Sequence, residues 1–400
     1  MPWTLVVVLT ILLPLAAVNF YVGRKILRAL SALISWNRKR LRLIVIGIYV
    51  YLNLLPLVYF LAYLAAGRAT VPAFSGDNYL IDIILSYPFW IALVVMIQLS
   101  LLFVIFDIFK FAIIRFIEPL MRWWKSHSAL VVVLSACFVS IYSIAVIVRD
   151  TWTVRVVERE ITLPDAFNRL SGFRIAEISD VQGDGRTTED ALRRYVANIN
   201  SLNPDLVLFG GDLVTAGTRY IDSTARILGQ LRSRFGTIAA VGDHDIFTNK
   251  PMVLKALGRA GIRVIEDSTI FLDVDSCRIA LSVVTYTYPQ RPAQAQLEKI
   301  SSQGQGDYRI LLVHQPAESI VEFARHKGYR MLLAGHTHGG GIAFGIPGVF
   351  LIAPASLESK YVSGLYHVGQ LNLSVTNGLG LTLAPVRFHA PAEIVLITLK

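Results

Sequence analysis

The chain has 400 residues, of which 54% are hydrophobic and only 16% are charged. This composition excludes an ordinary soluble globular protein, in which about a quarter of the residues are charged. The net charge of +10 would suit a nucleic-acid partner, but residues 1–150 carry +8 of it and the remainder only +2. The basic excess therefore belongs to the N-terminal part, and we expect no nucleic-acid partner.

Four apolar runs in residues 1–150 have the length that crosses a bilayer, about 20 residues. They lie at about residues 3–22, 43–66, 89–109 and 129–148. Four such runs argue against buried core helices, so we predict a membrane region of four transmembrane helices. The first run is followed, not preceded, by basic residues, which is typical of an anchor rather than a cleaved signal peptide. Asp107 lies near the end of the third run, and we interpret it as structural.

Basic residues alternate between the loops that join these runs. The first loop has seven and no acidic residue, the second has only Arg68, and the third has Lys110, Arg115, Arg122 and Lys125. Since positive residues mark the cytoplasmic side, loops one and three are predicted inside and residues 151–400 outside. The chain is thus predicted to be a multi-pass protein of the plasma (inner) membrane, in contact with its lipids.

Residues 151–400 have the pattern of one α/β domain. Apolar, strand-like runs at 173–178, 206–209, 237–241, 309–313 and 330–334 are separated by helical patterns. This alternation predicts a mixed, layered sheet. The sequence shows no internal repeat, and its two cysteines, Cys137 and Cys277, predict no disulfide framework.

Polar side chains follow five of the predicted strands directly. In open α/β sheets this edge is where ligands bind, and loops from distant positions converge there. A lone Asp after a strand is usually a turn or cap residue, and a lone His is usually core, but five such groups together predict one metal site. The groups are Asp180 with Gln182; Asp212; Asp243 with His244 and Asp245; His314; and His336 with His338 in the turn Gly335-His336-Thr337-His338-Gly339.

Carboxylates and imidazoles of this number suit divalent cations such as Zn²⁺, Mn²⁺ and Fe²⁺. They are more than one ion needs, and they suit two ions about 3.5–4 Å apart that share a bridging carboxylate. Two such ions generate hydroxide near neutral pH and neutralise phosphoryl oxygens during in-line attack. The sequence therefore predicts a metal-dependent hydrolase in which a metal-bound hydroxide attacks a phosphomonoester or phosphodiester.

The order of these groups resembles that of the calcineurin-like metallophosphoesterases, over about residues 158–400. Residues 163–175, 361–366, 377–380 and 393–399 further resemble the membrane-associated branch, which includes bacterial phosphodiesterases and UDP-diacylglucosamine hydrolases. The resemblance implies a layered mixed β-sandwich flanked by helices.

The resemblance also implies a role for each matching residue. His244 would face the substrate, stabilising phosphoryl oxygens or protonating the leaving group, with Asp245 orienting it. Asn377 would shape the rim of a substrate pocket, although a tight turn explains it nearly as well. For the metals, Asp180 and His338 would hold the first ion, Asp212 would bridge, and Asp243, His314 and His336 would hold the second.

Two residues depart from the family pattern. Gln182 stands where the family usually has His, and Asp243 stands where it usually has Asn. The ligand set thus loses one nitrogen and gains one carboxylate, which favours harder ions such as Mn²⁺ or Mg²⁺ and looser binding at the first site. We expect two divalent ions among Mn, Fe, Zn and Mg, with Mn favoured. Asp184, two residues after Gln182, is an alternative ligand.

The substrate and the functional class stay open at this stage. The anchor favours a lipid or glycolipid phosphate or a lipid-linked pyrophosphate, but it would equally retain an enzyme of soluble esters. A UDP-sugar lipid would require a cytoplasmic site, contrary to the charge pattern. The competing class is a catalytically weak metal- or phosphate-binding sensor coupled to the helices, and the His244-Asp245 pair argues against it. No obligate protein partner is evident.

Overall fold

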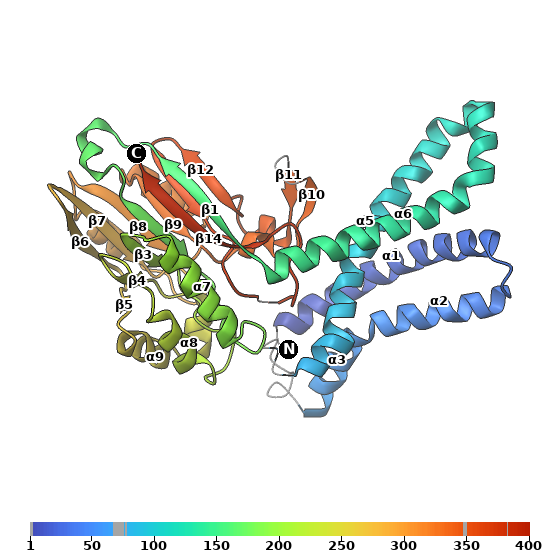
Figure 1. Ribbon diagram of the computed structural model, residues 1–400, viewed down its shortest axis with the longest axis horizontal. Coiled ribbons are helices and arrows are strands. Elements are labelled where there is room, and N and C mark those ends of the chain that lie inside the picture. The colour runs from blue at the N-terminus through green and yellow to red at the C-terminus, as the bar shows by residue number, and fades with distance from the viewer. Residues whose placement is uncertain (1–2, 67–75, 77, 347–349, 382) are drawn as a thin grey trace. The chain divides into compact units, whose positions relative to one another are not determined.

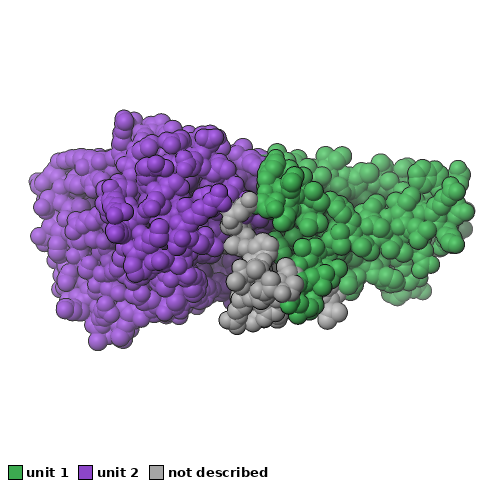
Figure 2. Space-filling view, turned by 90° about the horizontal axis from the view of Figure 1, so that it is seen from below, with its two compact units in different colours: residues 1–73, 78–148 green, residues 74–77, 149–400 purple. Residues whose placement is uncertain are grey.

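The computed structural model describes residues 3–66, 76, 78–346, 350–381 and 383–400 (Figure 1). The chain divides into two compact units (Figure 2). The first comprises residues 1–73 and 78–148, and the second comprises residues 74–77 and 149–400. We call the second the phosphodomain, because it carries all the site residues predicted above.

The first unit is helical. Polar side chains join its helices: Lys25 Nζ lies 2.6 Å from Asp107 Oδ1, and Gln98 Nε2 donates to Ser143 Oγ at 2.7 Å. Asp107 therefore has a structural role, since it ties α5 to α1. The elements are α1 Trp3–Leu33, α2 Arg38–Leu52, α3 Leu54–Ala66, α4 Tyr79–Ile81, η2 Asp82–Ser86, α5 Tyr87–Ala112, η3 Ile114–Phe116 and α6 Glu118–Trp152, which continues into the phosphodomain.

The number of membrane spans differs from the prediction. Within the described residues, Tyr79–Phe116 and Glu118–Trp152 are long and apolar enough to cross a membrane, and a third span exists only if the bent pair Arg38–Leu52 and Leu54–Leu61 counts as one. The predicted total of four is therefore not reached, although several side chains of the first predicted run, 3–22, lie outside the described residues.

The second predicted run, 43–66, is not one straight helix. It bends by 48° at Asn53, between α2 and α3. Pro56 explains the position of the bend, because a proline ring clashes with the carbonyl group four residues earlier, here that of Leu52, and offers no N–H to it. At the bend, the side-chain Nδ2 of Asn53 donates to Tyr49 O at 2.7 Å.

The phosphodomain is a sandwich of two six-stranded mixed sheets, as predicted. The sheets have the orders β1-β14-β2-β3-β4-β5 and β12-β13-β9-β8-β7-β6. The strands are β1 Val154–Ile161, β2 Arg174–Ile178, β3 Leu206–Phe209, β4 Thr237–Ala239, β5 Arg263–Val264, β6 Ser268–Val274, β7 Cys277–Val284, β8 Tyr308–Val313, β9 Met331–Ala334, β10 Phe344–Ile346, β11 Phe350–Ile352, β12 Gly364–Val368, β13 Leu371–Val375 and β14 Ala392–Leu399.

Helices cover both outer faces of the sandwich (Figure 1). Strand β3 shows why its sequence is apolar throughout: Leu206 and Leu208 point into the core between the sheets, while Val207 and Phe209 pack under the helices. The helices are α7 Glu189–Ser201, α8 Ile221–Leu228 and α9 Asp243–Arg259 on one face, and α10 Gln294–Ser301 and α11 Glu318–His326 on the other; short 3₁₀ turns are η4 Asp165–Leu170, η5 His338–Gly340 and η6 Pro354–Leu357.

Parallel strand order brings the site residues to one edge. In the first sheet β2, β3 and β4 are parallel neighbours, and in the second β8, β9 and β13 are parallel neighbours. Parallel strands end at the same edge of a sheet, so the loops after these six strands converge. The predicted metal and catalytic residues lie just after those strands, in the loops or, for Asp243, His244 and Asp245, in the first turn of α9.

A buried ionic group lies between the two sheets. The guanidinium of Arg159 on β1 donates to Glu393 Oε1 at 3.3 Å and to Ser374 Oγ at 2.5 Å, and it lies 4.0 Å from Glu177 Oε2. One cation thus faces two carboxyl groups. Burial raises the pKa of Glu177 to about 8, and the opposing effect of Arg159 is smaller. Glu177 therefore stays protonated in the folded domain at neutral pH.

This raised pKa predicts how the stability of the domain changes with pH. The contribution of protonated Glu177 to the free energy of unfolding is fully present below the pKa of an unfolded glutamate. It is lost as pH rises through about 8. We expect Glu177→Gln to be as stable as the wild type at pH 5 and more stable at pH 8.5, by roughly 2–4 kcal/mol. Thermal unfolding in detergent at both pH values measures this. Glu160→Gln, which changes an exposed acid on β1, is the control. The same dependence of stability on pH in the wild type and in Glu177→Gln would contradict the prediction.

Candidate metal centre

Asp180, Asp212 and His314 form the first group of metal-suited side chains. Each offers a ligand atom within 4.8 Å of the others, and all three are buried. His314 Nε2 lies 3.5 Å from Asp212 Oδ2, and His338 Nε2 lies 3.3 Å from Asp180 Oδ1. Gln182 joins them by donating its Nε2 to Asp212 Oδ2 at 2.9 Å. Five predicted ligands from the ends of β2, β3, β8 and β9 therefore meet here.

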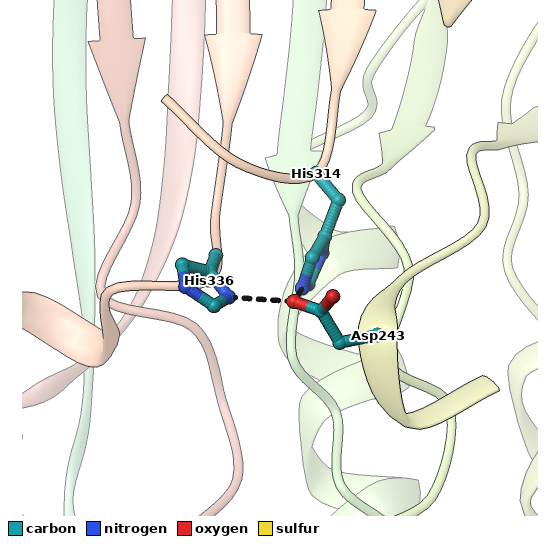
Figure 3. A group of neighbouring side chains, drawn as sticks. All are labelled: Asp243, His314 and His336. Carbon is teal, nitrogen blue, oxygen red and sulfur yellow. Dashed lines mark ion pairs between the residues drawn. The ribbon is translucent and has the colours of Figure 1, made fainter. Parts of the chain in front are cut away.

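Asp243, His314 and His336 form the second group (Figure 3). Asp243 Oδ2 lies 3.0 Å from His336 Nδ1 and 3.4 Å from His314 Nε2. In Figure 3 the two imidazoles point toward this carboxylate from neighbouring strands of the second sheet. His314 thus belongs to both groups. The resemblance assigns the shared position to Asp212, whose bridging role stays a prediction.

Unpaired buried atoms show that these residues fit cations. Asp180 Oδ1, Gln182 Oε1, His314 Nε2 and His338 Nδ1 are buried without a hydrogen-bond partner among the described residues. Buried polar atoms are nearly always paired, and a cation would satisfy such lone pairs. His314 is oriented for such a site, because its Nδ1 contacts Gly210 O at 2.8 Å and its Nε2 therefore faces the carboxylates.

Charge complementarity offsets the cost of burying these groups. Burial alone would raise the pKa of Asp243, but the imidazoles of His314 and His336 beside it hold that pKa well below its usual value. Burial alone would lower the pKa of His336, but Asp243 raises it to about 9. Burial lowers the pKa of His338 to about 4, so that this imidazole is neutral at pH 7 and keeps the lone pair that a ligand needs.

The backbone at the centre is unusual. Nine non-glycine residues with positive φ occur in the described part of the chain, and five are predicted ligands: Asp180, Gln182, Asp212, His336 and His338. Such conformations cost free energy and gather at functional sites. Gly335 is required here, because a Cβ atom would lie 2.3 Å from Asp180 Oδ2, where the His336 N–H donates at 2.9 Å.

The predicted role of Asp245 does not match its contacts. Its carboxylate accepts from the backbone N–H groups of Asp212, Leu213 and Gly242, at 2.8–2.9 Å. It therefore holds the turn that carries Asp212 against the start of α9. His244 is instead positioned by Thr215, whose carbonyl oxygen contacts His244 Nδ1, and by its own N–H, which donates to Asp212 Oδ1 at 2.8 Å.

Two further residues do not face the centre as ligands. Asp184 accepts from the Thr215 hydroxyl and from the N–H groups of Arg186 and Thr187, so its oxygens serve its own loop, and it is not the substitute ligand considered above. Asn377 accepts from the Ser363 hydroxyl and donates to Pro391 O, which joins two loops beside the centre.

Glu358 and Tyr288 are residues that the sequence did not reveal. Glu358 Oε2 lies 3.4 Å from His336 Nε2, so this carboxylate orients the imidazole whose other nitrogen faces Asp243. The Tyr288 hydroxyl donates to the same Glu358 oxygen, and the Tyr288 N–H donates to Asp243 Oδ1 at 2.7 Å. Neither residue follows a motif strand, so no local pattern identifies them.

The family model for calcineurin-like phosphoesterases matches residues 173–340, which contain every member of both groups. An uncharacterized metallophosphoesterase of Bacillus subtilis is 30% identical over 243 residues, 60% of this chain and 82% of the relative. The chain belongs to the calcineurin-like phosphoesterase family. It is therefore a metal-dependent phosphoric ester hydrolase by family.

Two other family members extend the comparison. A transmembrane protein with metallophosphoesterase domain from Danio rerio is 27% identical over 283 residues, 67% of this chain and 62% of that protein. An uncharacterized metallophosphoesterase of Campylobacter jejuni is 26% identical over 58% of this chain and 60% of its own length. The chain thus spans about three fifths of these two relatives. The name of the zebrafish protein agrees with the apolar helices of the first unit.

We expect the side chain at position 182 to influence which metal ion binds more tightly. Replacing Gln182 by His adds an imidazole nitrogen beside Asp212, so Gln182→His should bind Zn²⁺ at least tenfold more tightly, with less change for Mn²⁺. Competitive titration with a chromophoric chelator measures both affinities. Gln182→Leu, which fills the space without a ligand atom, should weaken both ions. An unchanged ratio of the two affinities in Gln182→His would refute the effect.

Proposed function

We propose that the protein is a membrane-anchored, dinuclear phosphoesterase that hydrolyses a phosphomonoester or phosphodiester. The observation that carries the proposal is the pair of ligand groups that share His314. Asp180, Gln182, Asp212 and His338 would hold one cation, with Asp243, His314 and His336 around the other. When bound, two divalent ions, with Mn²⁺ favoured, lower the pKa of an attacking water and neutralise phosphoryl oxygens.

His244 is the proposed catalytic residue of the protein itself. It lies half-buried in the first turn of α9, directly after Asp243, and its N–H donates to Asp212 Oδ1 at 2.8 Å. Contact of its Nδ1 with the Thr215 carbonyl oxygen requires a proton on that nitrogen, and so leaves Nε2 as the atom that meets substrate. From there His244 stabilises a phosphoryl oxygen or protonates the leaving group.

Removing this imidazole tests the proposed reaction. We expect His244→Ala to hydrolyse bis(p-nitrophenyl) phosphate with added Mn²⁺ about 10²–10⁴ times more slowly, since a positioned acid contributes about that much. Metal content should not change, because His244 is not among the ligand groups. His367→Ala on β12, an exposed histidine, is the control. Full activity in His244→Ala would show that His244 has no catalytic role. A wild-type protein that hydrolyses no lipid ester with any metal would favour the sensor function.

We also propose that the phosphodomain lies outside the cytoplasm and acts on a phosphoester of a lipid or glycolipid. The distribution of basic residues between the loops supports the orientation. Two reporters fused after residue 148, one active only outside the cytoplasm and one only inside, test it. We expect activity of the external reporter alone; activity of the internal reporter would reverse the orientation and admit a cytoplasmic nucleotide-lipid substrate.

A further inference from the structure

A small ribbon of two strands stands apart from the sandwich. Strands β10 and β11 pair only with each other, with Phe344 opposite Ile352 and Ile346 opposite Phe350 (Figure 1). Its large apolar side chains are exposed: 57% of Ile346, 53% of Phe350 and 65% of Ile352. Leu357, at the end of the η6 turn that follows, is 93% exposed. We call these four residues the apolar rim.

Both faces of strand β11 are apolar and uncovered. Successive residues of a strand point to opposite faces, and Phe350, Leu351 and Ile352 are all exposed. A strand that packs on a partner through one face keeps its other face polar toward water, and β11 has no such polar face. A two-stranded ribbon in water is marginally stable. These features favour surroundings that are apolar on all sides, as at the hydrocarbon boundary of a bilayer.

The absence of charged residues in the sequence around the rim also favours lipid surroundings. No charged residue occurs in the sequence from Gly339 to Leu357, so bringing this segment to a lipid surface buries no charged side chain. A bilayer would be close to the domain, because α6, which leads into it, is long and apolar enough to cross one. Only Thr153 separates the end of α6 from β1, the first strand of the phosphodomain. The domain is thus tethered without a linker.

Both ends of the segment lie at the metal centre. It begins after His338, and its first part is fixed by paired hydrogen bonds: Ala343 N to Phe388 O at 2.9 Å and Phe388 N to Gly341 O at 3.0 Å. The rings of Phe344 and Phe388 pack at 5.9 Å. It ends before Glu358, whose carboxylate contacts His336. The rim therefore lies in the stretch of chain between His338 and Glu358, and Leu357 directly precedes Glu358.

We infer that the apolar rim enters a lipid surface and presents the metal centre to phosphoesters anchored there by an alkyl chain. This inference rests on the proposed function and names its substrate class, an amphiphilic phosphoester in the lipid surface. The reaction is hydrolysis: water adds to phosphorus, the bond from phosphorus to the leaving oxygen breaks, and that oxygen takes a proton.

Two substrates with one leaving group test the substrate class. The full chain, reconstituted in phosphatidylcholine vesicles with Mn²⁺, is given bis(p-nitrophenyl) phosphate in solution or hexadecyl p-nitrophenyl phosphate in the vesicles. We expect the double variant Phe350→Ser/Ile352→Ser to lose about tenfold or more of the rate on the lipid substrate and to keep the soluble rate within twofold. Phe271→Ser, which changes an exposed phenylalanine on β6, should alter neither rate.

A measurement without turnover separates this inference from the proposed function. In a variant with Cys137→Ser and Cys277→Ser, an environment-sensitive fluorophore is attached at Phe350→Cys or, as control, at Phe271→Cys. We expect brominated lipids to quench the probe at 350 and not the probe at 271. Quenching together with no wild-type hydrolysis would support docking and overturn the proposed function.

Three outcomes would overturn the inference itself. They are an unquenched probe at 350, equal losses on both substrates in the double variant, and no loss on either. A change of oligomeric state in the double variant, measured in detergent by light scattering, would assign the rim to a second copy of the chain and would equally overturn it.

Discussion

The rest of the metal centre depends on one contact between the two sheets, that of His314 with Asp212 and Asp243. The imidazole follows β8 of one sheet, and the carboxylates follow β3 and β4 of the other, 3.4–3.5 Å away. Buried charges of either kind are costly alone and tolerated only as neighbours. The centre therefore exists only where the two sheets pack against each other, and the apolar core between them supplies the free energy that holds it together.

The residues around this contact mainly fix the backbone. Asp245 binds three N–H groups of the turns that carry the ligands, and Asp184 binds two N–H groups of its own loop. The fully buried Arg387 donates to the carbonyl groups of His338, Asn377 and Gly380, and so joins the loops after β9 and β13. Burial lowers the pKa of Arg387 to about 10, so it is still charged at neutral pH. These contacts offset the cost of five ligands in the left-handed region.

The apolar rim lies in the segment that joins the predicted ligand His338 to Glu358. The chain leaves the centre at His338, forms β10, β11 and η6, and returns at Glu358, which orients His336. Tyr288 completes this side, because it bonds both Glu358 and Asp243. The rim therefore lies between a predicted metal ligand, His338, and a residue that orients one, Glu358. Glu358 is also the first charged residue after the rim.

Local pattern was sufficient to predict a mixed, layered sheet and the identity of the residues that gather at its edge, whereas the β-sandwich was implied by the family resemblance. Each of Asp180, Asp212, Asp243, His314 and His336 directly follows an apolar run, and parallel strands place such positions at one edge whatever the intervening loops. Hydropathy also located the apolar helices of the first unit, but it did not locate the bend at Asn53, since an average over a window does not register the steric effect of Pro56 on Leu52.

What the sequence by itself determined is the set of ligand types and their order along the chain, because these are properties of single strands and the turns after them. Only the tertiary structure decided which groups meet: that His314 is common to both groups, that Asp245 serves the backbone rather than His244, and that Glu358 reaches His336. The physical reason is that these contacts join residues far apart in the chain, whose separation is set by how the two sheets pack and not by any local preference.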